Sequence, residues 1–197
     1  MELNNQTIAS ACDNLETRIS RLPETARAVI AAGAAWRLMR NHLDLPESLQ
    51  IDFVLTWSDV VSMLWDNVAD SGGEPRRVLS TKLEDYYLGP YSHKLGEDAL
   101  PGADEDAAAA AIYAVEAYCT GNVKDAVCAA MQLVTEAATR ANRIAFDSGE
   151  PWNARESEIR SFAFQQIELN RFDRVVSLLE TEEPIRAMPL IRQIFAG

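Results

Sequence analysis

The stretch from residue 104 to residue 146 constrains the fold of this chain more than any other. Apolar residues in it recur at three- and four-residue steps, which places them on one face of a helix. The break at Thr120-Gly121-Asn122 divides the stretch in two, and a glycine just past a helix end is typical of a C-terminal cap. Alanines fill residues 107–111, where they favour helix and let neighbouring backbones approach closely. The stretch therefore predicts a helical hairpin with four deeply buried positions, Val115, Val127, Ala130 and Val134.

The same spacing predicts helices along most of the remaining chain. The predicted segments are 7–22, 23–42 with Pro23 in its first turn, 57–69, 75–86 and 154–180. Residues 48–56 are ambiguous between strand and helix, and we favour helix because no second strand is available for pairing. Residues 185–195 contain Pro189, so we expect a piece that is short, bent or frayed. The pattern as a whole predicts an all-α fold, a single-domain helical bundle over residues 1–197 with about seven to nine helices around the Ala-rich hairpin.

The chain is strongly acidic, which narrows the classes of partner. It has 197 residues, of which 18 are lysine or arginine and 30 are aspartate or glutamate, giving a formal charge of −12. That balance argues against a nucleic-acid-binding surface, which requires clustered positive charge. It is compatible with a basic protein partner and also with acidity that serves solubility alone.

The cysteines and the hydropathy of the chain lead to an expectation about its cellular localisation. The three cysteines, Cys12, Cys119 and Cys128, lie in or beside apolar helical faces without Cys-x-x-Cys spacing, so we expect reduced, buried thiols. The first residues are polar and do not resemble a signal peptide. No apolar run approaches the length of about eighteen residues that a membrane helix needs. We therefore expect a cytoplasmic protein that does not enter a membrane.

Side chains that could carry chemistry are sparse. The two histidines, His42 and His93, are too few for a three-histidine zinc site, and neither has the Glu-x-x-His spacing of a di-iron centre. The sequence contains no phosphate-binding glycine loop and no nucleophile elbow. We therefore predict no catalytic residues, no metal and no cofactor. The one candidate ligand site is the irregular stretch around residues 86–93, because loops often carry function, and its candidate residues are Tyr87, Tyr91 and His93.

Several segments together resemble one family. These are Arg18-Ile19-Ser20-Arg21-Leu22-Pro23, Val61-Ser62-Met63-Leu64-Trp65-Asp66, the stretch from Leu100 to Asp106 before the Ala-rich helix, and the segment 155–180. With them the chain resembles the YjaG-like family, which comprises all-helical bacterial proteins of unknown function. The resemblance implies an all-α domain, and it implies no reaction and no functional residues.

Three functions stay open at this point. The first is a non-enzymatic binding or accessory protein, one form of which is an immunity-type antitoxin that covers a basic toxin. The second is a small-ligand-binding protein or enzyme that uses the loop with Tyr87, Tyr91 and His93. The third is self-association through an apolar patch, which exposed Trp57, Trp65 or Phe195 would support. The partner is therefore predicted to be an unknown protein or a second copy of the chain.

Overall fold

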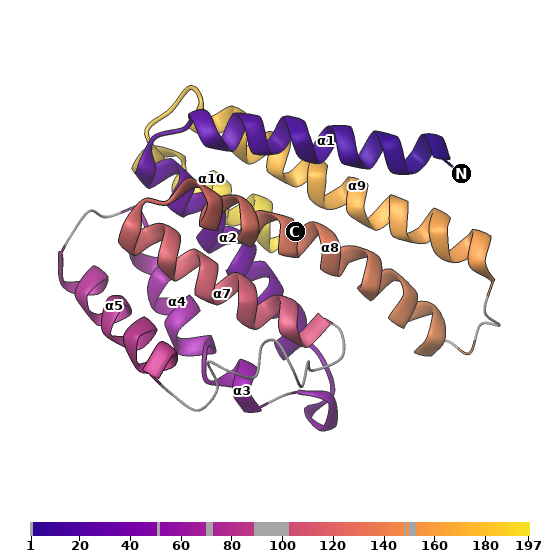
Figure 1. Cartoon of the computed structure of the whole chain (residues 1–197), viewed down its shortest axis with the longest axis horizontal. Helices are drawn as coiled ribbons and strands as arrows, with labels where there is room; N and C mark the ends of the chain where they lie inside the picture. Colours follow the sequence, from indigo (N-terminus) through magenta and orange to yellow (C-terminus); the bar gives the residue numbers. More distant parts are fainter. Residues whose placement is uncertain (1, 51, 70–72, 89–102, 148, 150–152) are drawn as a thin grey trace.

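The chain folds into a bundle of α-helices (Figure 1). The computed structural model describes residues 2–50, 52–69, 73–88, 103–147, 149 and 153–197. Its helices are α1 (Glu2–Arg21), α2 (Glu24–Leu43), the short 3-10 helix η1 (Glu47–Leu49), α3 (Asp52–Leu55), α4 (Ser58–Asn67), α5 (Gly73–Leu88), α7 (Ala103–Thr120), α8 (Val123–Asp147), α9 (Ala154–Leu179) and α10 (Pro184–Ala196).

The predicted fold class is confirmed, since every regular element in the described residues is helical and none is a strand. The ambiguous stretch near residue 51 contains η1 and α3, so its described part is helical as expected. No helix within the described ranges is long and apolar enough to cross a bilayer.

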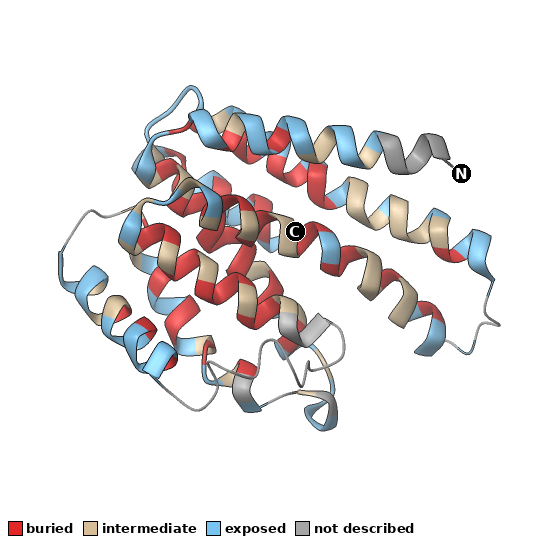
Figure 2. Cartoon of the chain, in the orientation of Figure 1, coloured by how far each residue is buried: buried red, intermediate tan, exposed pale blue. Residues whose placement is uncertain are grey.

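Three helices, α2, α7 and α8, form the centre of the core. These helices are rich in alanine, and most of their alanines are fully buried. Figure 2 shows buried residues concentrated on these central helices. The four positions that the sequence predicted to be buried are buried, with Val115 and Ala130 fully inaccessible. Because alanine has no side chain beyond Cβ, the helix axes can lie close together without leaving voids. The hairpin of α7 and α8 is therefore central, as predicted, and α2 packs against both of its helices.

The turn between α7 and α8 depends on one glycine. Gly121 has φ +71°, a left-handed conformation that glycine adopts without steric cost. Its carbonyl accepts a hydrogen bond of 2.8 Å from Arg27 Nη2 of α2. The predicted glycine cap is therefore present, and the same residue connects the hairpin to α2.

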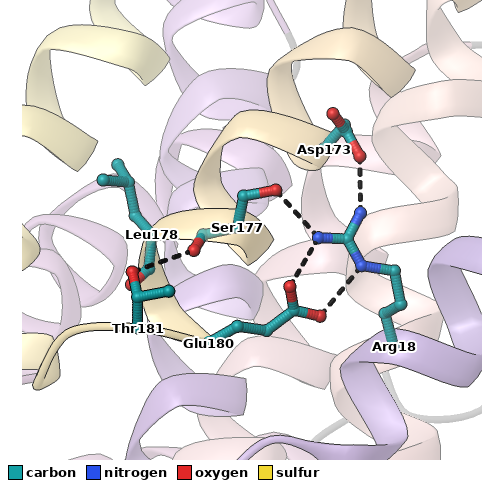
Figure 3. Close-up of polar contacts among 6 residues, drawn as sticks. All are labelled: Arg18, Asp173, Ser177, Leu178, Glu180 and Thr181. Atoms are coloured by element: carbon teal, nitrogen blue, oxygen red, sulfur yellow. Dashed lines mark hydrogen bonds and ion pairs between the residues drawn. The ribbon is translucent and has the colours of Figure 1, made fainter.

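Arg18 of the outer helix α1 forms a group of polar contacts with α9 and its C-terminal cap (Figure 3). Arg18 donates from Nε and Nη2 to the two oxygens of Glu180, at 2.9 and 2.8 Å, and from Nη2 to Ser177 Oγ at 2.9 Å. Its Nη1 group lies 2.5 Å from Asp173 Oδ1. The paired Glu180 carboxylate has a lowered pKa, chiefly because it accepts these hydrogen bonds. Arg18 thus joins two helices that are far apart in sequence and run side by side in Figure 1.

The last helix, α10, departs from expectation. It is continuous for 13 residues, so the expectation of a short or frayed piece is wrong. Pro189 is exposed and lies only five residues after Pro184, so the hydrogen bond lost at its missing N–H belongs to the start of the helix. Buried apolar side chains hold the helix, and near its end the Ile194 carbonyl accepts a hydrogen bond of 2.9 Å from Arg171 Nε.

The large aromatic residues that were candidates for an exposed patch lie in the core. Trp57, Trp65 and Phe195 are all buried. Trp65 stacks on Trp36 at a ring-centroid distance of 5.8 Å and meets the Phe195 ring edge-on at 5.8 Å. These residues therefore provide no surface for self-association.

The cysteines also differ from expectation. Cys12, Cys119 and Cys128 are free thiols, but each is only partly buried. Cys12 and Cys119 pack against the core without being enclosed by it.

The contact between α2 and α10 leaves no room for a side chain at Gly33. A Cβ atom added there would lie 2.2 Å from Cε2 of the Phe195 ring. Replacing a helical glycine with alanine usually stabilises by roughly 0.5–1 kcal/mol. Here we expect Gly33→Ala to destabilise the fold by roughly 1–3 kcal/mol, because the phenyl ring must move. Urea titration of the variant and the parent measures the difference.

Two further variants isolate the contact. Gly73→Ala is the control, because nothing lies within 4 Å of the Cβ position there, and we expect it to be close to neutral. In a Phe195→Leu background, Gly33→Ala should lose most of its cost, since the conflicting ring atoms are gone. A stabilising Gly33→Ala in the parent protein would show that the Phe195 ring does not fill the space beside Gly33.

Candidate functional site

The structure places only one of the three predicted ligand residues. Tyr87 lies in the last turn of α5, which extends to Leu88 and so beyond the predicted segment 75–86. Tyr87 is therefore helical, which corrects the expectation that it belongs to an irregular loop, whereas Tyr86 lies within the predicted helix. Tyr91 and His93 lie outside the described residues, so their convergence with Tyr87 stays a prediction.

Tyr87 is held against α7 while much of its ring faces solvent. Its hydroxyl donates a hydrogen bond to Glu116 Oε1, and 50% of the residue is exposed. Its ring lies 5.4 Å from the ring of Tyr86, which is buried and meets Trp57 edge-on at 5.5 Å. Helix α5 thus ends in one buried and one exposed tyrosine, both fixed by contacts with neighbouring helices.

The electrostatics of this region favour protonated groups. Burial raises the pKa of Glu116, the hydrogen bond from Tyr87 opposes that rise, and Asp125 adds to it. Burial is also the main cause of the raised pKa of Tyr87, and the hydrogen bond to Glu116 reinforces it. Burial raises the pKa of the Cys128 thiol as well. A thiol with a raised pKa is mostly protonated at neutral pH and is a weak nucleophile.

The end of α5 exposes acidic and apolar side chains together. Glu84 and Asp85 are exposed, and neither forms an ion pair with another described residue. Leu88 is 88% exposed beside them. Basic residues of α5 lie earlier in the helix, where Arg76 binds Glu24 at 2.5 Å and the Tyr118 carbonyl at 2.6 Å. This last turn therefore presents negative charge around an apolar centre. We call Glu84, Asp85, Tyr87 and Leu88 the α5 tip.

A buried ion cluster is the feature that sequence reasoning missed. Glu168 of α9, only 1% exposed, pairs with Arg171 and also with Arg140 of α8, whose Nη2 lies 2.9 Å from Glu168 Oε1. Arg140 also approaches Glu136, 3.8 Å away, and Asn41 Nδ2 of α2 donates to that carboxylate at 3.4 Å. The cluster joins α8 and α9 through charges that are largely removed from water, and the neutral Asn41 amide connects it to α2.

The arginines in and around this cluster repel one another electrostatically. Burial lowers the pKa of Arg171 to about 10, and the charges of Arg37, Arg140 and Arg174 add to this effect. The pKa of Arg37 is lowered for the same reasons, by burial first and by Arg140 second. The pKa of Glu136 is raised by burial, although Arg140 opposes the shift. Breaking one partner of such a buried pair typically costs about 3–5 kcal/mol.

Metal ligands were not expected, and the described residues offer no group of three histidine, cysteine, aspartate or glutamate side chains that could hold an ion. His42, one of the two histidines, is buried in α2. The other, His93, lies outside the described residues.

The chain matches no protein-family model, no curated protein and no solved structure. Its resemblance to the YjaG-like family therefore stays a prediction made from the sequence.

The hydrogen bond between Tyr87 and Glu116 predicts a pH effect. The pKa of Tyr87 is raised above its ordinary value of 10.0 in the folded protein. A group of this kind contributes stability below its unfolded pKa, and the contribution is lost as pH rises through the folded pKa. We expect the free energy of unfolding to fall between about pH 8 and about pH 11, and to fall less in Tyr87→Phe.

Urea titrations of the parent and the variant at both pH values measure this difference. Phenolate absorbance in the folded state provides a second readout, because Tyr87→Phe should remove one late-titrating group. An equal loss of stability in the two proteins would show that Tyr87 does not hold its proton through Glu116.

Proposed function

We propose that this protein is a non-enzymatic, cytoplasmic binding protein whose α5 tip engages a basic protein partner. The observation that carries the proposal is the unpaired negative charge around Tyr87 and Leu88 at the end of α5. Interfaces commonly consist of an apolar or aromatic anchor inside a polar rim. The α5 tip has this composition on one helical turn.

The distribution of charge along the chain also favours a basic partner for the segment that contains α5. Residues 44–88 contain nine acidic and three basic residues, half of the net charge of the chain in less than a quarter of its length. The described acidic side chains in this segment are all exposed, including Asp52, Asp59 and Glu74. An excess of negative charge of this kind accelerates association with a partner of opposite charge.

The fixed position of Tyr87 supports a binding role for it. A side chain already held by Glu116 and by the Tyr86 ring loses little conformational freedom when a partner covers it. One specific form of this function is an immunity-type antitoxin that covers a basic toxin surface. The raised pKa values of the Cys119 and Cys128 thiols favour a binding role over nucleophilic catalysis by these cysteines.

Charge reversal at the α5 tip tests the proposal. Tagged parent protein captures partners from an extract of the source organism, and each captured protein is then purified and titrated directly. We expect at least one direct partner with a basic surface. For that partner, Glu84→Lys/Asp85→Lys should reduce affinity by roughly tenfold or more, and the association rate of the parent should fall as salt rises.

The matched control reverses two acidic residues elsewhere. Glu156 and Glu182 are exposed near opposite ends of α9, and neither forms an ion pair with another described residue. Glu156→Lys/Glu182→Lys makes the same change in net charge, so it should keep most of the affinity. Equal losses in the two variants would show that only overall charge matters and would contradict an interface at the α5 tip.

A further inference from the structure

A hollow of about 410 Å³ opens between α9 and α10. Its apolar wall consists of Ile167 from α9 and of Leu190 and Ile194 from α10. Ile167 and Leu190 are exposed, although most large apolar residues of this chain are buried. A volume of this size lies within the usual range for small-ligand sites, roughly 300–1,000 Å³. We call this hollow the α9–α10 groove.

The polar side of the groove is basic. Two guanidinium groups, Arg171 and Arg174, line it together with the amides of Asn170 and Gln193, and no aspartate or glutamate is among the described residues that line it. This is unusual in so acidic a chain. Residues 137–174 contain six arginines and six acidic residues, so the whole net charge of −12 lies elsewhere.

The two arginines differ in the hydrogen bonds and ion pairs that they form within the protein. Arg171 is fixed, because its Nε donates to the Ile194 carbonyl and its Nη1 pairs with Glu168, and only 8% of its side chain is exposed. Its Nη2 forms no hydrogen bond with another described residue. Arg174 is exposed and has neither a hydrogen bond nor an ion pair within the described part of the chain. The charges of the two residues repel, so an anion between them would relieve an unfavourable interaction.

Gly197 also borders the groove. The buried ion cluster fixes the groove residue Arg171, since Glu168 pairs with both Arg140 and Arg171. The site therefore combines a rigid buried arginine, a free exposed arginine and an apolar wall.

We propose that the α9–α10 groove binds a small organic carboxylate with an apolar tail. The carboxylate lies between Arg171 and Arg174, which can donate several charge-assisted hydrogen bonds to it. The tail lies against Ile167, Leu190 and Ile194. This site is separate from the α5 tip and does not depend on the function proposed there.

Three probe molecules separate the contribution of the carboxylate from that of the apolar tail. Hexanoate has both a charge and a tail, acetate has the charge alone, and hexan-1-ol has the tail alone. We expect hexanoate to bind the full chain in a 1:1 complex, roughly tenfold or more tighter than either other probe. Calorimetry measures affinity, and shifts of the side-chain amide resonances of Asn170 and Gln193 locate the ligand. Binding should also raise the Tm in proportion to occupancy.

Arg174→Gln is the informative variant, because this exposed residue forms no hydrogen bond or ion pair with another described residue. We expect it to weaken hexanoate binding by roughly tenfold, the usual scale for a hydrogen bond to a charged group. Arg186→Gln is the control, since it removes an exposed arginine of α10 that does not line the groove. Leu190→Asn should weaken hexanoate while leaving acetate unchanged.

Three results would overturn the proposal. Hexanoate could bind no tighter than acetate and hexan-1-ol, or Arg174→Gln could bind it as well as Arg186→Gln does. The amide shifts could also fall outside α9 and α10. A failure at the α5 tip would leave all three readouts unchanged, so the two proposals are distinguishable.

Discussion

The close approach of α2, α7 and α8 through small side chains is the constraint on which the rest of the structure depends. Alanine at the facing positions allows three backbones to pack without voids, and Gly33 extends the same principle to α10 by admitting the Phe195 ring. Close packing of this kind has little tolerance for added volume, because neighbouring helices cannot separate without losing contacts elsewhere. The larger side chains accordingly lie around this centre, as the Trp36, Trp65 and Phe195 rings do between α2, α4 and α10.

The sequence predicted the parts of the fold that depend on local pattern. Apolar spacing located the α7–α8 hairpin and the long helix α9, and the composition of the turn identified the Gly121 cap. It did not predict contacts between distant residues, such as Arg18 with Glu180 or Arg140 with Glu168, because no local pattern encodes them. A partial signal existed for Glu168, which lies four residues before Phe172 and so shares the buried face of α9. Pro189 misled the prediction for α10, since burial of one face outweighs a single lost hydrogen bond.

The two candidate sites also differ in how much of each could be predicted from the sequence. Tyr87 was predicted, but its role was assigned to a loop, whereas the end of α5 and a bond to Glu116 position it. The α9–α10 groove has no sequence signature. Its arginines look like ordinary residues of an amphipathic helix, and the groove exists only because α10 packs beside α9. The two surfaces carry opposite charge, with carboxylates at the α5 tip and guanidinium groups in the groove. Both surfaces lie on helices that pack against the central helices α2, α7 and α8.

One comparison tests most directly whether tight packing of small residues determines this architecture. Ala130 is fully buried in α8, and Ala163 is exposed on α9, so leucine at each position adds the same atoms to a helix in different surroundings. Urea titration should show that Ala130→Leu lowers the free energy of unfolding by roughly 1–3 kcal/mol, whereas Ala163→Leu changes it by less than about 0.5 kcal/mol. If both variants kept the stability of the parent protein, the three central helices would not be closely packed, and small residues would not be what determines the fold.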